Sequence, residues 1–517
     1  MLHRCLQQGL YAILLFTPAY LFSQTPQSDS SRVEIIHADI LRISEDGEGR
    51  ITTLSGAVQL RQKGMLMQCD SARMIQSSNM VFAFGRVQIN RESLIIRSQQ
   101  LIYAGNDQFA RLSGGVSLIR DNMKLNTPSL DYDMRTGIST YQAGGKVTRE
   151  TTQIISRKGT YNENTELVFF TDSVRVNDPE YIMSSDTLRY DRTLEQFTFF
   201  PGTEILSSGN RIECHSGTYQ VRNNQATFGK GTTMHNPPQI LHADSLFYDQ
   251  KKGIAIMHDR FHWKDSGMQA EILAFKGRYE EKKRVIIAAN DPLLITRTDP
   301  DTLWLTADTL LSCQVSETDS TRLFYAWHKV RMFNKNFQGV CDSLSYSFAD
   351  STFHFFIQPV MWTEGIQIYG DTLSLRTKRN QPDYMFARKQ SWIISDSDTS
   401  LALYDQIKGV STHGYFDQNE LKKVHVVQNA ESLYFGKTEK GVYEGANKSK
   451  CAEIWIYFAD KKISKISFVK KPEAVYTPIR KLARSEYTLE GFRVESSRRP
   501  ISPQDIAPVW LKSVSKQ

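Results

Sequence analysis

Two short patterns alternate along the chain and decide its fold. The first is LSGAVQL at residues 54–60, which returns as FAFGRVQI at 82–89 and LSGGVSL at 112–118. The second pattern is a small residue, Asp, Ser or Thr, Leu, any residue and an aromatic residue. Examples are SSDTLRY at 184–190 and HADSLFY at 242–248. Because both patterns return several times, the chain is first interpreted as an array of repeats.

The repeat length is 29 residues. The aromatic position of the second pattern recurs at this interval in Met74, Tyr103, Tyr132, Tyr161, Tyr190, Tyr219 and Tyr248. The valine of the first pattern recurs in the same way in Val58, Val87 and Val116, and Val174 lies two repeats further on. Weaker copies with less regular spacing continue to about residue 440, which gives about fourteen units.

Each unit predicts two strands and two turns. Apolar residues alternate with a period of two, and β-branched and aromatic types dominate, as is typical of strands. Turn-forming residues such as Lys63-Gly64 and Asn106-Asp107 separate these segments. No amphipathic helix is predicted before residue 475. The sequence therefore predicts an all-β, elongated, solenoid-like fold of two-strand repeats of about 29 residues.

The alternation also predicts which side chains are buried. In the second pattern Leu and Tyr are two residues apart, so they share one face of a strand. We expect these residues to form apolar rows in register on neighbouring strands, made of Leu101, Leu130, Leu188, Leu246, Tyr103, Tyr132, Tyr190 and Tyr248.

Composition and charge narrow the classes of function. The chain has 517 residues, of which 40% are hydrophobic and 23% charged, which is too polar for a protein with many membrane-spanning segments. Residues 461–517 hold 13 basic and 5 acidic side chains, a net charge of +8, so the remainder of the +7 chain carries −1. This neutral body argues against nucleic acid as a partner.

We expect residues 441–517 to hold the last strands and a basic, Pro-containing tail, which either docks on an acidic partner or lipid phosphates or stays solvated.

The N-terminal segment predicts export. Residues 1–23 combine an early positive charge with an apolar stretch too short to span a membrane, which is typical of a secretory signal peptide. An uncleaved anchor is the alternative. A polar linker at 24–32 precedes the array at 33–440, and we expect the first strand, with Val33, Ile35 and Ile36, to be an open edge that pairs with a partner.

Taken together, the G-x-V strands, the ADS-L-x-Y strands and the signal peptide resemble the OstA-like, or organic-solvent-tolerance-like, family of periplasmic lipopolysaccharide-transport proteins. The resemblance covers residues 33–440, which is long enough for two or three consecutive OstA-like domains. The segments PEAVYTPI and LEGFRVESSRRPISPQDI resemble the ending of the long Bacteroidetes members.

The resemblance implies a fold and a function. The fold would be a β-taco or β-jellyroll, with two sheets folded on each other around an apolar groove. The function would be a periplasmic bridge, associated with the outer membrane, that carries lipopolysaccharide or its lipid A part. Partners would be inner-membrane and outer-membrane components of the transport machinery, with head-to-tail self-association. The acyl chains would lie against the predicted rows and against Val58, Val87, Val116 and Val174.

Two other classes remain open from the residues alone. One is a secreted β-solenoid adhesin or structural spacer, because any solenoid needs an apolar inner row. The other is a β-helix carbohydrate-active enzyme, although we find no catalytic set among the abundant Ser and Asp residues. His37 and Asp39 lie two apart, but Asp is a repeat position, so we predict no metal site and no cofactor.

Overall fold

The computed structural model of the protein describes residues 32–511, apart from residues 48, 208, 299–300, 316–320, 364, 379–380, 399–400 and 460–461. The predicted signal peptide at 1–23 and nearly all of the predicted linker at 24–32 lie outside this range. The described chain divides into two compact units, with the boundary between Glu150 and Thr151.

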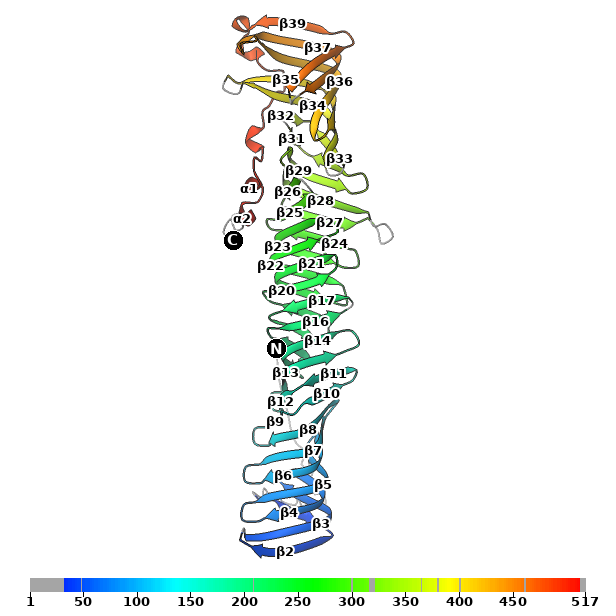
Figure 1. The fold of residues 1–517 in the computed structure, drawn as a ribbon, viewed down its shortest axis with the longest axis vertical. Helices are drawn as coiled ribbons and strands as arrows, with labels where there is room; N and C mark the ends of the chain where they lie inside the picture. The colour runs from blue at the N-terminus through cyan, green and yellow to red at the C-terminus, as the bar shows by residue number, and fades with distance from the viewer. Residues whose placement is uncertain are drawn as a thin grey trace, which may run out of the picture. The chain divides into compact units, whose positions relative to one another are not determined.

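Unit 1 consists of strands alone among its described residues (Figure 1). They are β1 (Glu34–His37), β2 (Ile40–Asp46), β3 (Gly49–Gln62), β4 (Met65–Ile75), β5 (Met80–Arg91), β6 (Leu94–Ala104), β7 (Phe109–Arg120), β8 (Met123–Asp133), β9 (Ile138–Tyr141) and β10 (Gly145–Arg149). The strands from β2 to β8 each pair antiparallel with the next. The pairs β3 with β4, β5 with β6 and β7 with β8 are the predicted repeats.

Unit 2 continues the same architecture. Its first strands are β11 (Thr152–Ser156), β12 (Lys158–Asn162), β13 (Leu167–Asn177), β14 (Ile182–Asp191), β15 (Gln196–Phe199), β16 (Thr203–Ser207), β17 (Asn210–Cys214), β18 (Gly217–Gln220), β19 (Gln225–Phe228), β20 (Thr232–Asn236), β21 (Gln239–Asp249), β22 (Ile254–Asp265) and β23 (Ala270–Glu280). The next are β24 (Val285–Ala289), β25 (Leu293–Thr298), β26 (Asp301–Thr306), β27 (Thr309–Gln314), β28 (Arg322–Phe333), β29 (Phe337–Ser347), β30 (Thr352–Phe356), β31 (Val360–Thr363), β32 (Ile366–Tyr369) and β33 (Thr372–Lys378). The last are β34 (Gln381–Asp398), β35 (Leu403–Asp417), β36 (Glu420–Lys437), β37 (Tyr443–Ala459), β38 (Lys462–Val469) and β39 (Glu473–Pro478).

Short helices follow only at the end of the described chain. They are the 3-10 turns η1 (Ile479–Lys481), η2 (Arg484–Glu486) and η3 (Ser496–Arg498) and the α-helices α1 (Pro503–Ile506) and α2 (Pro508–Leu511). Within the described residues, none of these helices has the length and apolar character that crossing a membrane requires. The all-β fold class predicted from the sequence is confirmed.

In each strand that carries the G-x-V pattern, a β-bulge at the pattern bends the strand. The strand register shifts between Phe84 and Val87, and Gly85 and Arg86 both have positive φ, at 75° and 42°. A Cβ on Gly85 would lie 2.4 Å from a carboxylate oxygen of Asp70, which pairs with Arg86 at 2.6 Å. The same contact joins Gly56 to Asp39, so at these two bends the Gly of one pattern and the Asp of the other are neighbours.

The bends give each unit two walls that face each other. We call wall A the strand halves that carry the tyrosine rows, and wall B the halves that carry the G-x-V valines. Inward side chains from both walls form the core, including Leu54 and Leu112 in wall A and Ile89 and Ile96 in wall B, none more than 1% exposed. The predicted taco-like arrangement is confirmed, although the two walls are halves of the same bent strands in one sheet and not two separate sheets.

The tyrosine rows are in register, as predicted. In unit 1, Tyr103 and Tyr132 both lie opposite Ala110, one on each side of it. In unit 2, directly opposite pairs run in one line through Tyr161, Val168, Tyr190, Phe197, Tyr219, Ala226, Tyr248, Ala255 and Tyr279. Small residues alternate with rings in part of each row, which lets large side chains interdigitate.

The C-terminal segment does not behave as the sequence predicted. We expected a basic tail that is solvated or docks on an acidic partner or on lipid phosphates. Instead, residues 479–511, which we call the strap, lie on the outer face of wall B of unit 2, and Figure 1 shows α1 and α2 beside β25 and β26. The strap packs there because its apolar side chains Leu489, Ile506 and Trp510 are buried against this wall.

Candidate functional site

The interior between the two walls is the candidate functional site. It holds the predicted groove residues in both units: Val58, Val87, Val116, Leu101, Leu130, Tyr103 and Tyr132 in unit 1, and Val174, Leu188, Leu246 and Tyr190 in unit 2, all at most 4% exposed. Tyr248 is only half-buried, and its hydroxyl donates to Glu281 Oε2 at 3.2 Å. These residues pack against one another, so the interior is closed over most of its length.

The free ends of the two walls meet along a line that we call the seam. In unit 1, polar side chains cross it. The buried Tyr103 hydroxyl at the end of wall A donates to Gln62 Oε1 at the end of wall B, at 2.6 Å, and Gln62 Nε2 donates to the Gly105 carbonyl at 3.1 Å. Burial raises the pKa of the Tyr103 hydroxyl, which therefore stays protonated and donates this bond.

A second contact of the same kind follows one repeat later. Arg91 Nη1 donates to the Tyr132 hydroxyl and to the Met134 carbonyl, at 3.0 Å each. We call these two contacts the seam latches. The repeat rows did not predict these latches, although the sequence holds a signal: Gln62 and Arg91 are 29 residues apart, and Arg120 and Arg149 continue the series.

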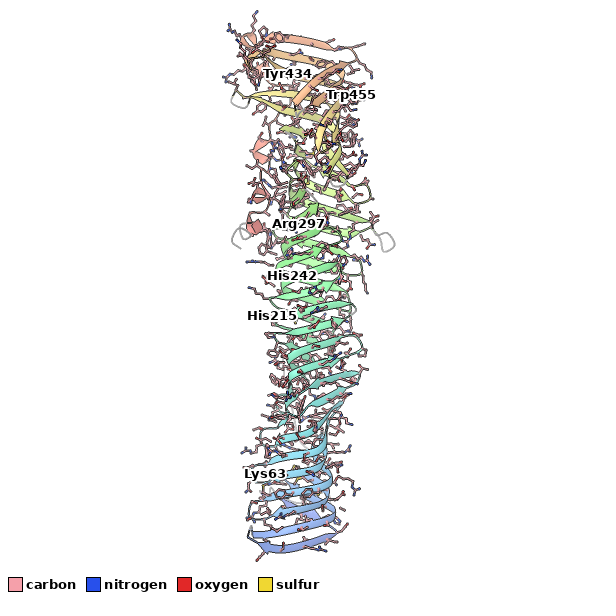
Figure 2. All side chains as sticks on the ribbon, in the orientation of Figure 1. Lys63, His215, His242, Arg297, Tyr434 and Trp455 are labelled. Carbon is pink, nitrogen blue, oxygen red and sulfur yellow. The ribbon has the colours of Figure 1, made fainter. Side chains whose placement is uncertain are left out.

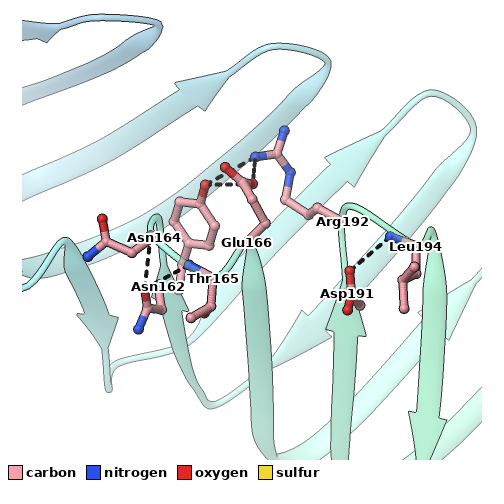
Figure 3. A network of polar contacts seen from close by, with 8 residues as sticks. Asn162, Asn164, Thr165, Glu166, Asp191, Arg192 and Leu194 are labelled. Atoms are coloured by element: carbon pink, nitrogen blue, oxygen red, sulfur yellow. Dashed lines mark hydrogen bonds and ion pairs between the residues drawn. The ribbon is translucent and has the colours of Figure 1, made fainter.

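In unit 2, polar networks hold the seam ends of the tyrosine row. Arg192 Nη1 donates to the Tyr161 hydroxyl at 3.1 Å and to Glu166 Oε2 at 2.5 Å (Figure 3). In the adjoining turns, Asn162 accepts from the backbone of Asn164 and Thr165, and Asp191 accepts from the backbone of Leu194. The ends of the row are thus fixed by charge-assisted and turn hydrogen bonds.

Unit 2 also contains a gap in the side-chain packing between wall A and wall B. A cavity of about 110 Å³ lies between the walls, lined by Trp263, Ile272 and Leu294 from wall B and by Phe324 and Tyr346 from wall A, among other mostly apolar side chains. The Ser312 hydroxyl belongs to the lining and has no hydrogen-bond partner among the described residues. A cavity of this size and polarity accepts an apolar group more readily than water.

The interior is open at the N-terminal end of unit 1. Among the described residues, β1 and β2 pair only with β3, so their outer edge is unpaired. Ile35, Leu41 and Ile43 lie opposite the inward Leu60, Leu54 and Thr52, yet they are 36%, 49% and 49% exposed. We call these three residues the mouth.

The predicted partner-binding residues lie at this edge. Ile35 and Ile36 are exposed in β1, whereas Val33 precedes the strand and is buried, with its backbone N–H donating to Asn79 Oδ1 at 3.2 Å. Val33 therefore anchors the strand, and only the two isoleucines are accessible to a partner.

The interior thiols are unsuited to nucleophilic chemistry. Cys69 and Cys341 are free and buried beside the bends, and burial raises the pKa of these thiols to about 11 and about 12. Both stay protonated at neutral pH, and the thiolate is the reactive form.

Replacing Arg91 by Leu should open the second seam latch. The Tyr132 hydroxyl and the Met134 carbonyl then lose the Arg91 guanidinium as a donor, and we expect the free energy of unfolding of unit 1 to fall by about 1–3 kcal/mol. Urea unfolding followed by circular dichroism measures this loss. Arg97→Leu is the matched control, because Arg97 is exposed and, among the residues that the structure describes, hydrogen-bonds only to Gln88 on the outside of wall B. Equal stability of the two variants would contradict the latch.

The comparison with protein families matches this part of the molecule. Residues 30–186 match the family model described as OstA-like protein, which covers unit 1 and the first strands of unit 2. No curated protein sequence matches the chain. The resemblance stated from the G-x-V and ADS-L-x-Y strands is therefore confirmed over these residues.

Proposed function

Residues 30–186 are an OstA-like domain, and from this premise we propose that the protein is a non-catalytic periplasmic bridge that carries lipopolysaccharide toward the outer membrane. The acyl chains of the lipid A part travel between wall A and wall B, and the sugar head stays outside. The observation that supports this most directly is the apolar interior that is lined from both walls and exposed at the mouth.

The closed packing of the interior sets the mechanism. Burying an acyl chain removes apolar area from water at about 25 cal/mol per Å², but here the chain must first separate Leu101 and its neighbours from the opposite wall. The walls are continuous at the bends and joined at the seam by the latches, so the seam is where they part. The lipid enters at the mouth and moves along the interior, and the latches release as it passes and close behind it.

The unpaired edge of β1 and β2 supplies the partner contact. Its backbone groups can extend the sheet of a neighbouring protein by strand addition, which would join the two apolar interiors through the mouth. The proposed partner is an inner-membrane component of the transport machinery, or another copy of this chain in head-to-tail association.

Photocrosslinking at the mouth tests the proposal. We place a benzophenone amino acid at Leu41 or Ile43, which face inward, and at Arg42, which lies between them and faces outward. Because all three positions are exposed, the substitutions leave the core unchanged. After irradiation of cells, lipopolysaccharide adducts are expected at positions 41 and 43 and not at 42. Equal labelling of all three positions, or no lipid adduct at any of them, would refute lipid passage through the mouth.

A β-solenoid spacer is the second candidate, and the tight packing of the inner rows favours it. A spacer needs a closed core and no ligand. It predicts protein adducts at positions 41–43 and no lipid adducts, so the same experiment separates the two functions.

A further inference from the structure

Ser312 interrupts the tyrosine row of unit 2. Beyond Tyr279, directly opposite pairs continue the row through Ile286, Ser312, Phe324, Tyr346 and Phe353. The neighbours of Ser312 in this row are large and mainly apolar, whereas serine is small and polar. A large side chain is therefore missing at this point, and the cavity of about 110 Å³ between the two walls lies there, with Ser312 in its lining.

The Ser312 hydroxyl is buried in this cavity without a partner. Ser312 is 4% exposed, and its Oγ forms no hydrogen bond among the described residues. Asn334 and Thr377, which also line the cavity, already donate to backbone carbonyls. A buried water needs about three polar partners, so water satisfies Ser312 poorly. The cavity therefore suits a mainly apolar group that brings one hydrogen-bonding oxygen.

The cavity also reaches the seam. Its lining includes Met268, in the turn at the seam end of wall B, and Phe348, in the turn at the seam end of wall A. Phe348 is 41% exposed, so this end of the cavity borders solvent. Arg297, labelled in Figure 2, marks the height of the cavity in unit 2, because it follows the lining residue Thr296 in β25 and points outward. The polar end of a ligand can thus stay in water while its chain lies inside.

We propose that this cavity is a preformed site for one acyl chain that carries an oxygen substituent, such as a hydroxyl or an ester, and that Ser312 donates a hydrogen bond to that oxygen. The inference rests on the proposed function, since it gives the lipid one favoured position along the interior. An apolar cavity of about 150 Å³ holds a benzene ring, so a cavity of about 110 Å³ holds a short stretch of chain without displacing side chains.

Ser312 also makes the site selective. A plain hydrocarbon chain fills the same space but leaves the Ser312 hydroxyl unpaired, which is unfavourable for a buried polar group. A chain with a suitably placed oxygen fills the space and satisfies the hydroxyl. Ser312 is therefore a specificity-determining residue for oxygen-bearing chains.

Calorimetry with the purified protein tests the site. The probes are decanoate and a series of hydroxydecanoates with the hydroxyl at different carbons, all kept below the concentrations at which they form micelles. Ser312→Ala removes the hydroxyl, and Ser312→Phe supplies a ring like that of the opposite Phe324. Ser345→Ala is the matched control, because Ser345 precedes the lining residue Tyr346 and points to the outer face of wall A.

We expect at least one hydroxydecanoate to bind the unchanged protein about fivefold more tightly than decanoate does, as one net hydrogen bond provides. Ser312→Ala should bring this ratio close to one, and Ser345→Ala should leave it unchanged. Ser312→Phe should weaken the binding of all probes by at least about tenfold, because the ring occupies the space. Absence of binding, a ratio that survives Ser312→Ala, or an affinity that Ser312→Phe leaves unchanged would overturn the proposal.

The photocrosslinking at the mouth separates this site from lipid transport. Lipid adducts at positions 41 and 43 without hydroxydecanoate binding would reject the site alone. Binding that depends on Ser312 without lipid adducts at the mouth would support the site and reject only the transport.

Discussion

Removing residues 479–517 should lower the free energy of unfolding of unit 2 by at least about 5 kcal/mol. The strap buries Leu489, Ile506 and Trp510, and a large apolar side chain contributes about 1.5–3 kcal/mol when fully buried. Its loss would also expose Trp362 and Trp392 of wall B, which belong to the same apolar cluster. Urea unfolding followed by tryptophan fluorescence measures the change.

Buried glutamines add to this loss. Gln406 Nε2 donates to the Tyr487 carbonyl and Gln406 Oε1 accepts from the Leu489 backbone, both at 2.8 Å, and Gln367 holds Arg493 and Glu495 in the same way. Water takes the place of these bonds once the strap is gone, so each one contributes about 0.5–1.5 kcal/mol net to the loss.

The matched control for the truncation keeps the strap and changes only its exposed side. Ile501 and Val509 are 78% and 50% exposed, so Ile501→Ser with Val509→Ser should change stability by less than about 0.5 kcal/mol. A truncated protein as stable as this control would show that the strap is merely a solvated tail.

Replacing Leu101 by Ala should cost unit 1 about 2–5 kcal/mol, which is the usual range for a leucine removed from a packed core. Leu101 is 1% exposed and lies between Ala83 and Leu112 in its row of wall A. The adjacent Ile102 points outward and is 43% exposed, so Ile102→Ala is the control and should change stability little. Chemical denaturation of both variants gives the difference.

This pair also reports on the state of the interior. If the walls of the ligand-free protein stand apart in solution, Leu101 lines an open groove and its truncation costs about as little as that of Ile102. A large difference between the two variants shows that the walls of the ligand-free protein are packed against each other.

Much of the fold follows from local sequence because the repeat is simple. Alternation of apolar and polar residues predicts strands, and the interval of 29 residues predicts that Tyr103 and Tyr132 fall in one row, since a strand pair of constant length places equivalent residues at equal heights. Gly85 is a glycine because the bend leaves no space for a Cβ beside the Asp70 carboxylate. These relations hold between neighbouring strands, so a single sequence is enough to predict the strands and their rows.

The seam and the strap depended on contacts that no local rule supplies. Gln62 meets Tyr103, 41 residues away, only because two bent walls bring their ends together. Gln406 meets Leu489, 83 residues away, only because the outer face of wall B is apolar enough to hold the strap. The sequence by itself determined the strands, their register and the inward rows, because these follow from the period and the alternation of the repeat. Only the tertiary structure decided that the interior is closed, that latches join the walls, and that the basic C-terminal segment packs on its own chain, because burial depends on which surfaces finally meet.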